Sequence, residues 1–493
     1  MTSMEYEVIV VGGGLSGLAA ADKLSKQGLK VLVLEASDRF GGRTLTVRSE
    51  DGGAHDLGGR WLAPSQHLMH ALCAELGISV RKQHTGGYAI MHPGGAGSVR
   101  KYHGTVPPIP ILSQLEPAKD LLDVAVRMVW GCECRDISLL FALHYSNVAG
   151  GFAQLVDAEG AAQDSYIEGG AQQLSERLAA RVAGRKGCAC ISEAPVYQID
   201  HGGELGGSGE DGVSSKELGE TGVAASYERG ASSNGPEPSE EGASLKAGQC
   251  ETESGSHSSH PASNNNASEE RGRNGGAIVH SAKGAFRAKA VIVAVPPTMI
   301  IRHISFFPPL PLLQEQIGSR YFMGSYTKAV VCYPTPFWRE KGFSGEAMAA
   351  GYSREHPVLM SFDVSGEGGA YAALACFITG ALADDHGGVT EEEQRAGVVR
   401  SLVRFFGEEA RAFTELHLKV WADDLWTKGC PVNLAPPGVT CKYAGVLRKP
   451  IGCLHWAATE TSTRWLGYME GALEAGYRAA GEVEQWLSKV EPK

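Results

Sequence analysis

The residues with the clearest chemistry stand near the start of this 493-residue chain. Gly12, Gly14 and Gly17 follow an apolar run, and Glu35 ends a second apolar run eighteen residues after Gly17. In such a pattern the first glycine permits a tight turn and the second lets the backbone approach a pyrophosphate. The third lets a helix pack closely on a strand, and the acidic residue accepts hydrogen bonds from a ribose. The spacing therefore predicts a dinucleotide site.

The surrounding sequence supplies the elements that must position this site. Residues 5–80 predict a strand, a helix, a second strand and an amphipathic helix near 65–77. The N-terminus of the first helix would present free N–H groups and a positive dipole end to phosphate. Far downstream, "IGCLHWAATETSTRWLGYMEGALEAG" predicts a strand, a polar turn and a closing helix. We expect the two ends of the chain to complete one domain.

The length and net charge of the chain restrict the number of domains and the kinds of partner that we expect. The length predicts two or three domains. The net charge of −11 argues against nucleic acid as a partner. Residues 201–275 hold thirteen Asp or Glu and five Lys or Arg, with few large apolar residues and no periodicity. This composition predicts a disordered acidic insertion. The apolar runs on either side of it predict neighbouring strands of one sheet, joined by a surface hairpin.

The cysteine and hydropathy patterns indicate in which cellular compartment the protein is expected. The eleven cysteines are scattered, which is typical of reduced thiols rather than a disulfide framework. The pairs Cys132/Cys134 and Cys188/Cys190 lack further ligands at zinc spacing, so we expect no metal site. We see no secretory signal and no apolar stretch of about 20 residues. The sequence thus predicts a cytoplasmic protein without a membrane anchor.

Three further motifs carry a family resemblance. They are Gly41-Gly42-Arg43-Thr44, "DLGGRWLAPSQ" and "HWAATETSTRWLGYMEGALEAG". Together with the glycine pattern they resemble the flavin-containing amine oxidases, in the monoamine oxidase and putrescine oxidase branch. The resemblance covers the chain outside 201–275. It implies an α/β fold, with a discontinuous Rossmann-like FAD-binding domain of the glutathione-reductase type and an α+β substrate domain.

The resemblance also implies how the domains alternate along the chain. The FAD-binding domain is expected in four parts, 1–80, 168–200, 276–317 and 424–493. The substrate domain is expected in two parts, 81–167 and 318–423. The acidic segment 201–275 interrupts the FAD-binding domain.

The cofactor implied by the resemblance is FAD. The residues expected to contact it are Gly12, Gly14, Leu15, Ser16, Gly17, Glu35, Ala36, Gly42, Arg43, Gly58, Gly59, Arg60, Trp61, Val196, Cys430, Ala458, Thr459, Glu460, Tyr468 and Met469. Arg43 matches the family arginine near the pyrophosphate, where a guanidinium can bind phosphate oxygens in a bidentate fork. Cys430 matches a cysteine whose sulfur is bonded to the flavin ring in some relatives. Other relatives lack it and hold FAD non-covalently, and the match here favours a thioether.

The family's catalytic positions are also present. Lys328 matches the lysine that holds a water against the flavin, Trp421 the tryptophan packed near the ring, and Tyr468 one wall of the aromatic cage around the amine. Further residues expected in the substrate pocket are Val156, Gln163, Met360, Phe377 and Pro431.

The chain departs from the mitochondrial enzymes at several positions. Pro431 stands where their second cage tyrosine lies, so we expect a cage with one ring and a preference for small aliphatic amines or diamines. Ser37 replaces an arginine near the adenosine. Ala458 replaces a glycine, so a methyl group is expected to press toward the cofactor. The stretch between Pro110 and about Leu121 is also shorter than in those enzymes.

The function implied is oxidative deamination of an amine, with a hydride passing to FAD and O₂ as the acceptor, giving H₂O₂, an aldehyde and ammonia. The expected partners are a small-molecule amine and O₂, while the oligomeric state stays open and a dimer is compatible with the family. Two alternatives stay open. One is a different flavin oxidase, acting on polyamines or L-amino acids or as a desaturase. The other is a degenerate FAD-binding protein without amine turnover.

Overall fold

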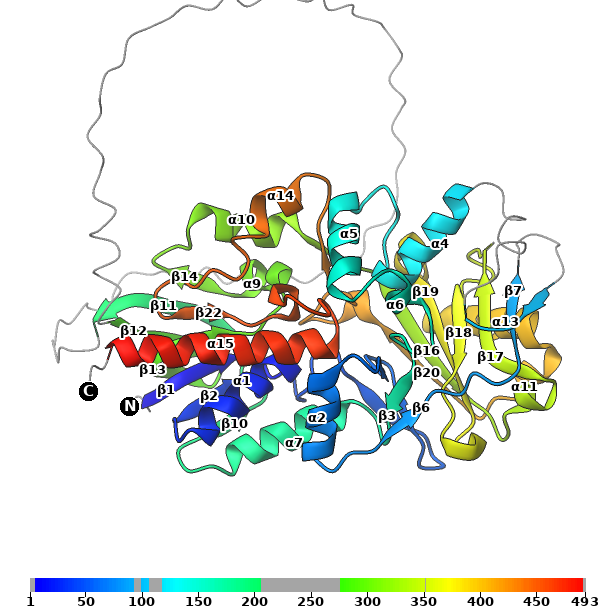
Figure 1. The fold of residues 1–493 in the computed structure, drawn as a ribbon, viewed down its shortest axis with the longest axis horizontal. Helices are drawn as coiled ribbons and strands as arrows, with labels where there is room; N and C mark the ends of the chain where they lie inside the picture. The colour runs from blue at the N-terminus through cyan, green and yellow to red at the C-terminus, as the bar shows by residue number, and fades with distance from the viewer. Residues whose placement is uncertain (1–4, 93–98, 106–117, 205–274, 351, 491–493) are drawn as a thin grey trace, which may run out of the picture. The chain divides into compact units, whose positions relative to one another are not determined.

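The computed structural model describes residues 5–92, 99–105, 118–204, 275–350 and 352–490. Two large β-sheets organise them (Figure 1). The first has eight strands: β1 (Glu5–Val11), β2 (Val31–Leu34), β10 (Ala189–Ile191), β11 (Val196–Glu204), β12 (Gly275–Ser281), β13 (Gly284–Val293), β14 (Ser305–Phe307) and β22 (Leu454–Trp456). Strands β10, β2, β1, β13 and β22 pair in parallel. Parallel strands are buried on both faces, which explains why β1, β2 and β13 contain nearly continuous apolar runs.

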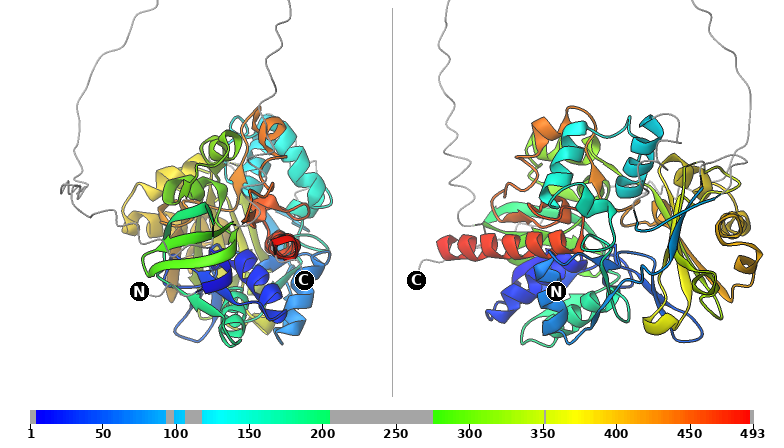
Figure 2. Two further views of the ribbon diagram at one scale, coloured as in Figure 1. Left: turned by 90° about the vertical axis from the view of Figure 1, so that its left-hand side faces the viewer. Right: turned by 45° about the vertical axis from the view of Figure 1, so that its right-hand side comes forward.

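Helices from distant parts of the chain cover one face of this sheet. They are α1 (Leu15–Lys26), α2 (His67–Glu75), α7 (Gln172–Ala183) and α15 (Met469–Val490), and α1 packs against both α7 and α15. Leu18, Leu24, Leu174 and Leu473 are fully buried in the shared core. In Figure 2 the long C-terminal helix α15 lies beside α1 in both views. The two ends of the chain therefore build one layer.

The second large sheet has seven strands in the order β20-β16-β19-β18-β17-β7-β8. They are β7 (Tyr88–His92), β8 (Arg100–Tyr102), β16 (Tyr326–Cys332), β17 (Phe343–Ala349), β18 (Met360–Asp363), β19 (Ala373–Thr379) and β20 (Glu415–Val420). Pairing is antiparallel except between β17 and β7. Helix α13 (Glu391–Phe406) buries Val398, Leu402 and Phe405 in the core of this sheet.

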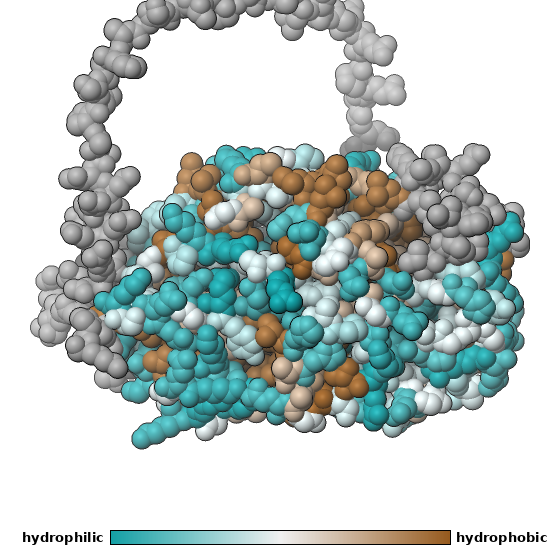
Figure 3. Space-filling model, viewed as in Figure 1, coloured by the Kyte–Doolittle hydropathy of each residue, from teal (hydrophilic) through white to brown (hydrophobic). Residues whose placement is uncertain are grey.

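Shorter elements connect the two sheets. The small strands are β3 (Thr46–Arg48), β4 (Ala54–Asp56), β5 (Trp61–Leu62), β6 (Val80–Lys82), β9 (Ser165–Ile167), β15 (Phe322–Met323) and β21 (Asn433–Leu434). The remaining helices are α4 (Ala118–Trp130), α5 (Leu139–Val148), α6 (Ala153–Val156), α9 (Pro297–His303), α10 (Leu312–Arg320), α11 (Phe337–Glu340), α12 (Ala381–Gly387) and α14 (Val439–Tyr443). On the face drawn in Figure 3, apolar side chains gather along the upper edge, where α5 exposes Leu139, Leu140 and Leu143.

Several predicted elements are confirmed. The helix expected near 65–77 corresponds to α2. The strands expected on either side of the acidic insertion are β11 and β12, which pair antiparallel. Both boundaries of the insertion were wrong, because residues 201–204 still belong to β11 and Gly275 begins β12, where it pairs with Glu204. The rest of the predicted insertion, 205–274, lies outside the described residues. Among the helices that are described, none is long and apolar enough to cross a bilayer.

Candidate active site

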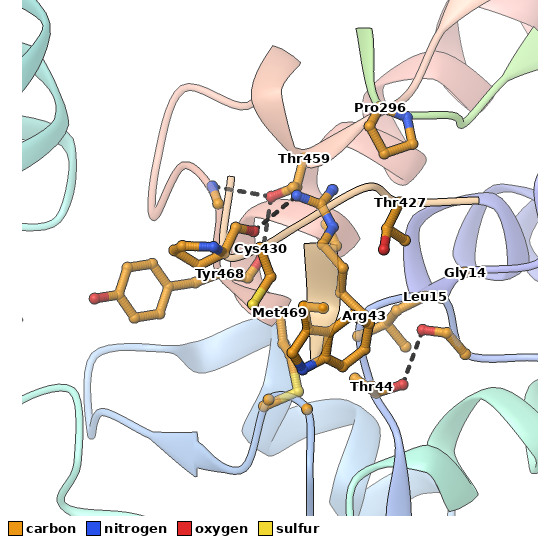
Figure 4. Close-up of a pocket in the computed structure, with 18 of the residues that line it drawn as sticks. Gly14, Leu15, Arg43, Thr44, Pro296, Thr427, Cys430, Thr459, Tyr468 and Met469 are labelled. Atoms are coloured by element: carbon orange, nitrogen blue, oxygen red, sulfur yellow. Dashed lines mark hydrogen bonds between the residues drawn. The ribbon is translucent and has the colours of Figure 1, made fainter. Parts of the chain in front are cut away.

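A cavity of about 350 Å³ lies where the two sheets meet. At one end it reaches the carboxyl end of β1 and the N-terminus of α1. At the other it reaches β16, β18 and β19 of the second sheet. Figure 4 shows Gly14 and Leu15 on one side of the cavity, Tyr468 on the opposite side and Arg43 between them. Residues from nearly every part of the chain thus converge on one space.

Gly12, Gly14 and Gly17 each require glycine for a different local reason. Gly12 adopts φ +106°, a conformation that side chains disfavour. A Cβ on Gly17 would lie 2.1 Å from the Gly12 carbonyl oxygen, so only glycine lets α1 pack here. A Cβ on Gly14 would meet no atom within 4 Å, because this position faces the open cavity. Helix α1 has no side-chain cap and no acidic residue in its first turn. Its N-terminal N–H groups therefore suit a phosphate.

Glu35 is fixed at the same end of the cavity. One carboxylate oxygen, Oε2, accepts a hydrogen bond from the Gly13 N–H at 2.6 Å. The other, Oε1, accepts from the backbone N–H of Ser37 at 2.8 Å and from its hydroxyl at 2.9 Å. Ser37, one of the departures from the mitochondrial enzymes, thus orients the acidic residue. The carboxylate lines the cavity with lone pairs to spare, as ribose binding requires.

Arg43 is held by protein partners as well as lining the cavity. Its Nη1 donates to Glu460 Oε1 at 2.8 Å and to the Pro431 carbonyl oxygen at 2.8 Å, and Nη2 lies 3.2 Å from Glu460 Oε2. Burial opposes the charge of Arg43, but Glu460 keeps its pKa above the usual value. Glu460 itself does not line the cavity. The fork of Arg43 is therefore shared with a buried carboxylate, and Glu460 acts on the site through Arg43.

Lys328 lies at the other end, on β16, and is only 3% exposed. Its ammonium donates to the Gly58 carbonyl oxygen at 2.9 Å and lies 5.2 Å from the ring centre of Trp61 and 5.1 Å from that of Phe377. Burial lowers the pKa of Lys328 to about 7. Trp421 is buried nearby, with Nε1 donating to the Leu57 carbonyl oxygen at 3.0 Å. A group that changes charge near neutral pH therefore faces the cavity.

Two groups of aromatic rings border the cavity. Tyr468 packs against Trp465, with ring centres 4.9 Å apart, and against Tyr145 of α5, at 6.2 Å. Neither the Tyr145 nor the Tyr468 hydroxyl hydrogen-bonds to another residue in the described part of the chain. In the second group, Trp61 lies 5.3 Å from Phe362 and 5.9 Å from Phe377. Pro431 lines the cavity, as expected.

Cys430 also lines the cavity, immediately before Pro431. Its backbone N–H donates to the Gly324 carbonyl oxygen at 3.0 Å, which anchors the segment to β15 and the start of β16. Burial raises the pKa of the Cys430 thiol to about 12, although Arg43 and Lys328 act in the opposite direction. Cys430 is half-buried and lines the same cavity as Lys328.

Most of the predicted site residues reach the cavity. Those that line it are Gly12, Gly14, Leu15, Ser16, Glu35, Ala36, Gly42, Arg43, Gly58, Gly59, Arg60, Trp61, Gln163, Val196, Lys328, Met360, Phe377, Trp421, Cys430, Pro431, Thr459, Tyr468 and Met469. Four others, Gly17, Val156, Ala458 and Glu460, do not. Gly17 serves helix packing, and Val156 packs in the core beneath α5.

Ala458 is not among the residues that line the main cavity. It borders a separate small cavity beside α9 and α10. The expectation that its methyl group presses toward the cofactor stays a prediction.

Sequence reasoning missed several residues that line the cavity. They include Thr44, Tyr145, Pro296, His303, Tyr326, Phe362, Trp426 and Thr427. Tyr326 precedes Lys328 by two residues on one strand, so period-two alternation could have placed both on one face. Tyr145 had no such signal, because it lies on an apolar helix without a motif.

Comparison with known proteins agrees with this geometry. A family model described as flavin containing amine oxidoreductase matches residues 15–128 and 269–484. The chain belongs to this family. A putative flavin-containing monoamine oxidase of Mycobacterium tuberculosis is 30% identical, over 98% of this chain and 97% of its own. Human amine oxidase [flavin-containing] B is 29% identical, over 99% of this chain and 88% of its own.

Solved structures give the same fold. Cyclohexylamine oxidase from Brevibacterium oxydans aligns with a TM-score of 0.75 and 27% identity, over 98% of this chain and 99% of its own. Putrescine oxidase bound to putrescine aligns with the same TM-score and coverage at 23% identity, which shows the fold alone. The predicted α/β fold is confirmed, and the chain is an FAD-dependent amine oxidoreductase.

Proposed function

We propose that this protein deaminates hydrophobic monoamines at the Lys328–Tyr468 end of the cavity, with FAD held along the fingerprint end. The observation that carries the proposal is one continuous cavity with a phosphate-compatible helix N-terminus at one end and aromatic rings with a buried lysine at the other. FAD, when bound, would accept a hydride from the amine α-carbon and pass two electrons to O₂, which would become H₂O₂. The imine left behind would be hydrolysed by water to ammonia and an aldehyde, or to a ketone where the α-carbon carries two carbon substituents.

The residues present fit FAD. Gly14 leaves open the space where a Cβ would stand, and the uncapped start of α1 offers N–H groups to the pyrophosphate. Glu35 would hold the ribose, and Val196 would border the adenine. Arg43 would contribute positive charge while bound to Glu460. We assign the eight-stranded sheet to an FAD-binding domain and the seven-stranded sheet to a substrate domain, as the sequence predicted.

The charge of the cavity selects the form of the amine. Three cationic side chains line it in the described part of the chain, Arg43, Arg60 and Lys328. The one carboxylate there, Glu35, is already bonded to Gly13 and Ser37 at the opposite end. An ammonium ion entering this space would lose water without gaining a counter-ion. The cavity therefore favours the neutral amine, whose nitrogen lone pair is free.

The same argument narrows the substrate class. A diamine carries a second ammonium, for which the described cavity offers no acidic partner, so the earlier expectation of diamine preference is replaced. Trp61, Phe362 and Phe377 offer apolar surface to an alkyl or cyclic group instead. One N–H of the Lys328 ammonium donates to the Gly58 carbonyl oxygen. Its other N–H groups are left to donate to a water or to the reacting nitrogen.

Amino acid oxidation fits the geometry less well, because a substrate carboxylate needs an available guanidinium. Arg43 is occupied by Glu460. Arg60 lies 4.2 Å from the ring centre of Tyr166 and donates to the Val364 carbonyl oxygen at 3.1 Å. Both arginines are thus engaged with the protein. The test below includes amino acids for this reason.

The deciding experiment mixes the purified yellow protein with each amine in the absence of oxygen. The loss of visible flavin absorbance measures the rate of flavin reduction. Cyclohexylamine, butylamine and benzylamine should bleach the flavin, and putrescine and L-leucine should do so at least about tenfold more slowly at equal concentration. Peroxide formation in air provides the matching steady-state measurement. Bleaching by putrescine at the rate of butylamine would contradict the charge argument. Absence of bleaching with every amine would favour a degenerate FAD-binding protein.

A further inference from the structure

A pair of buried charges lies beside Lys328, between β4 and β5. Asp56 is 2% exposed and Arg60 is 3% exposed, and Arg60 Nη1 lies 3.9 Å from Asp56 Oδ2. The carbonyl of Gly58, midway between them in sequence, accepts the hydrogen bond from Lys328. One short segment therefore brings a carboxylate, a guanidinium and the cavity lysine together.

Neither member of the pair is fully satisfied by hydrogen bonds. Asp56 Oδ1 accepts from the Thr46 hydroxyl at 2.6 Å and from the Ala171 N–H at 2.9 Å, whereas Oδ2 has no hydrogen-bond partner among the described residues. Arg60 donates through Nη2 to Val364, and its Nε is likewise unpartnered there. At 3.9 Å the two groups interact through charge rather than through a hydrogen bond. In a poorly solvated interior such charges act strongly on a nearby ammonium.

We propose that Asp56 and Arg60 are positioning residues that set the charge of Lys328 in opposite directions, the carboxylate favouring the ammonium form and the guanidinium opposing it. The consequence for catalysis rests on the proposed function, since Lys328 acts on the reacting groups only there. The effect on the charge of Lys328 does not depend on turnover.

Other charged groups around Lys328 are screened or neutralised. Lys419, its partner on β20, is bound to Asp424 at 2.9 Å and is partly exposed. Asp363 of β18 is bound by Arg339 at 2.6 Å. Phe377, its partner on β19, carries no charge, and Cys430 contributes only a weak effect because burial keeps its thiol protonated. Among the residues that the structure describes, Asp56 and Arg60 are thus the two charges left to act on the lysine.

The two charges act on the pKa of Lys328 in opposite directions. Burial is the main reason that the pKa of Lys328 falls, Asp56 raises it, and Arg60 lowers it further. Loss of the carboxylate should therefore drive Lys328 toward the neutral amine. Loss of the guanidinium should keep it charged to higher pH. A purely structural role for the pair would produce no such opposite signs.

The test measures the pKa of Lys328 directly, by trace acetylation of the holoenzyme with acetic anhydride across a pH series and quantification of the Lys328 peptide by mass spectrometry. Asp56→Asn keeps an acceptor for Thr46 and Ala171 and should lower the pKa by about one unit or more. Arg60→Gln should raise it by a similar amount. The double variant should return to within about half a unit of the parent, because both charges are removed together.

Asp164→Asn is the matched control. Asp164 is also buried and bound to a lysine, Lys82, but it lies just before β9, the central strand of the sheet formed by β5, β9 and β6, and it is not among the groups that act on Lys328. It should leave the pKa of Lys328 unchanged. If Asp56→Asn fails to fold, Arg60→Gln and the double variant still decide the question.

Single variants that both shift the pKa in one direction, or leave it unchanged, would overturn the proposal. Acetylation measures the pKa of Lys328 whether or not the protein oxidises an amine. Failure of the proposed function would therefore be distinguished from failure of this proposal. In an active enzyme, the pH dependence of anaerobic flavin reduction should move with the same signs.

Discussion

The two ends of the cavity are built by different means. The fingerprint end depends on backbone, with Gly12 in a positive-φ turn, Gly14 facing open space and the N–H groups of α1 left uncapped. The Lys328 end depends on side chains from separate elements, such as Tyr145 of α5, Lys328 of β16 and Tyr468 before α15. A site made of backbone tolerates almost no substitution, whereas a site made of side chains can change its specificity by exchanging one ring.

The largest effect should come from a side chain at the backbone-built end. Gly14→Val should reduce bound FAD by more than about tenfold, because its branched side chain occupies the space left for the pyrophosphate. The fold should survive, since a Cβ there meets no protein atom within 4 Å. Flavin absorbance per protein and thermal unfolding measure the two effects. Gly445→Val, at another open glycine in a turn, is the control and should retain its flavin.

At the side-chain end the effect should fall on catalysis. Tyr468→Ala should lower kcat/KM for cyclohexylamine by about 10- to 100-fold while FAD content is kept, because the ring borders substrate space. Tyr145→Phe removes only a hydroxyl and should cost less than about tenfold. Steady-state peroxide production gives both values. Equal losses of flavin and activity in Tyr468→Ala would place the ring against the cofactor instead.

Lys328 links catalysis to pH. With the pKa of Lys328 lowered from 10.5 to about 7, the unfolded chain binds more protons than the folded one between these values. Stability should therefore rise with pH across this window, and Lys328→Met should weaken that rise. The parent should also show an ionisation near pH 7 in flavin reduction that the variant lacks. Melting temperatures measured between pH 6 and 9 test this prediction. An equal rise of melting temperature with pH in the parent and in Lys328→Met would contradict it.

Cys430 allows covalent and non-covalent binding of the flavin to be told apart directly, without measuring a rate. If its sulfur holds the flavin, the yellow colour should stay with the polypeptide after acid precipitation, and Cys430→Ala should release all of it. The folded protein should lose little stability from this small change. Cys441, which is exposed and outside the cavity, supplies the control variant Cys441→Ala. Yellow supernatant from the parent protein would show non-covalent binding.

The smallest effect should come from the segment between β11 and β12. Glu204 pairs with Gly275 across the ladder, so a two-residue Asn-Gly turn can replace residues 205–274. Flavin content and turnover should change by less than about twofold, because loop closure depends weakly on length. A tenfold loss of activity would mean that this segment contributes to the site.

The sequence predicted the backbone-built end well and the other end unevenly. Gly12, Gly14 and Glu35 follow local rules of turn geometry and spacing, so their places could be inferred from a few dozen residues. Tyr145 could not, because it reaches the cavity only through the packing of α5 on the core that contains Trp465. Tertiary packing decides such positions, and no local pattern records it.

The pairing of Arg43 with Glu460 joins residues 417 positions apart, and Ser16 at the start of α1 bonds to the carbonyl of Ala457. Both partners follow the fingerprint by several hundred residues and are therefore made after it during translation. A ribosome-bound chain that has completed the fingerprint still lacks one wall of the cavity and the counter-ion of its arginine. A chain truncated before Trp456 should therefore emerge colourless even though its glycine motif is intact.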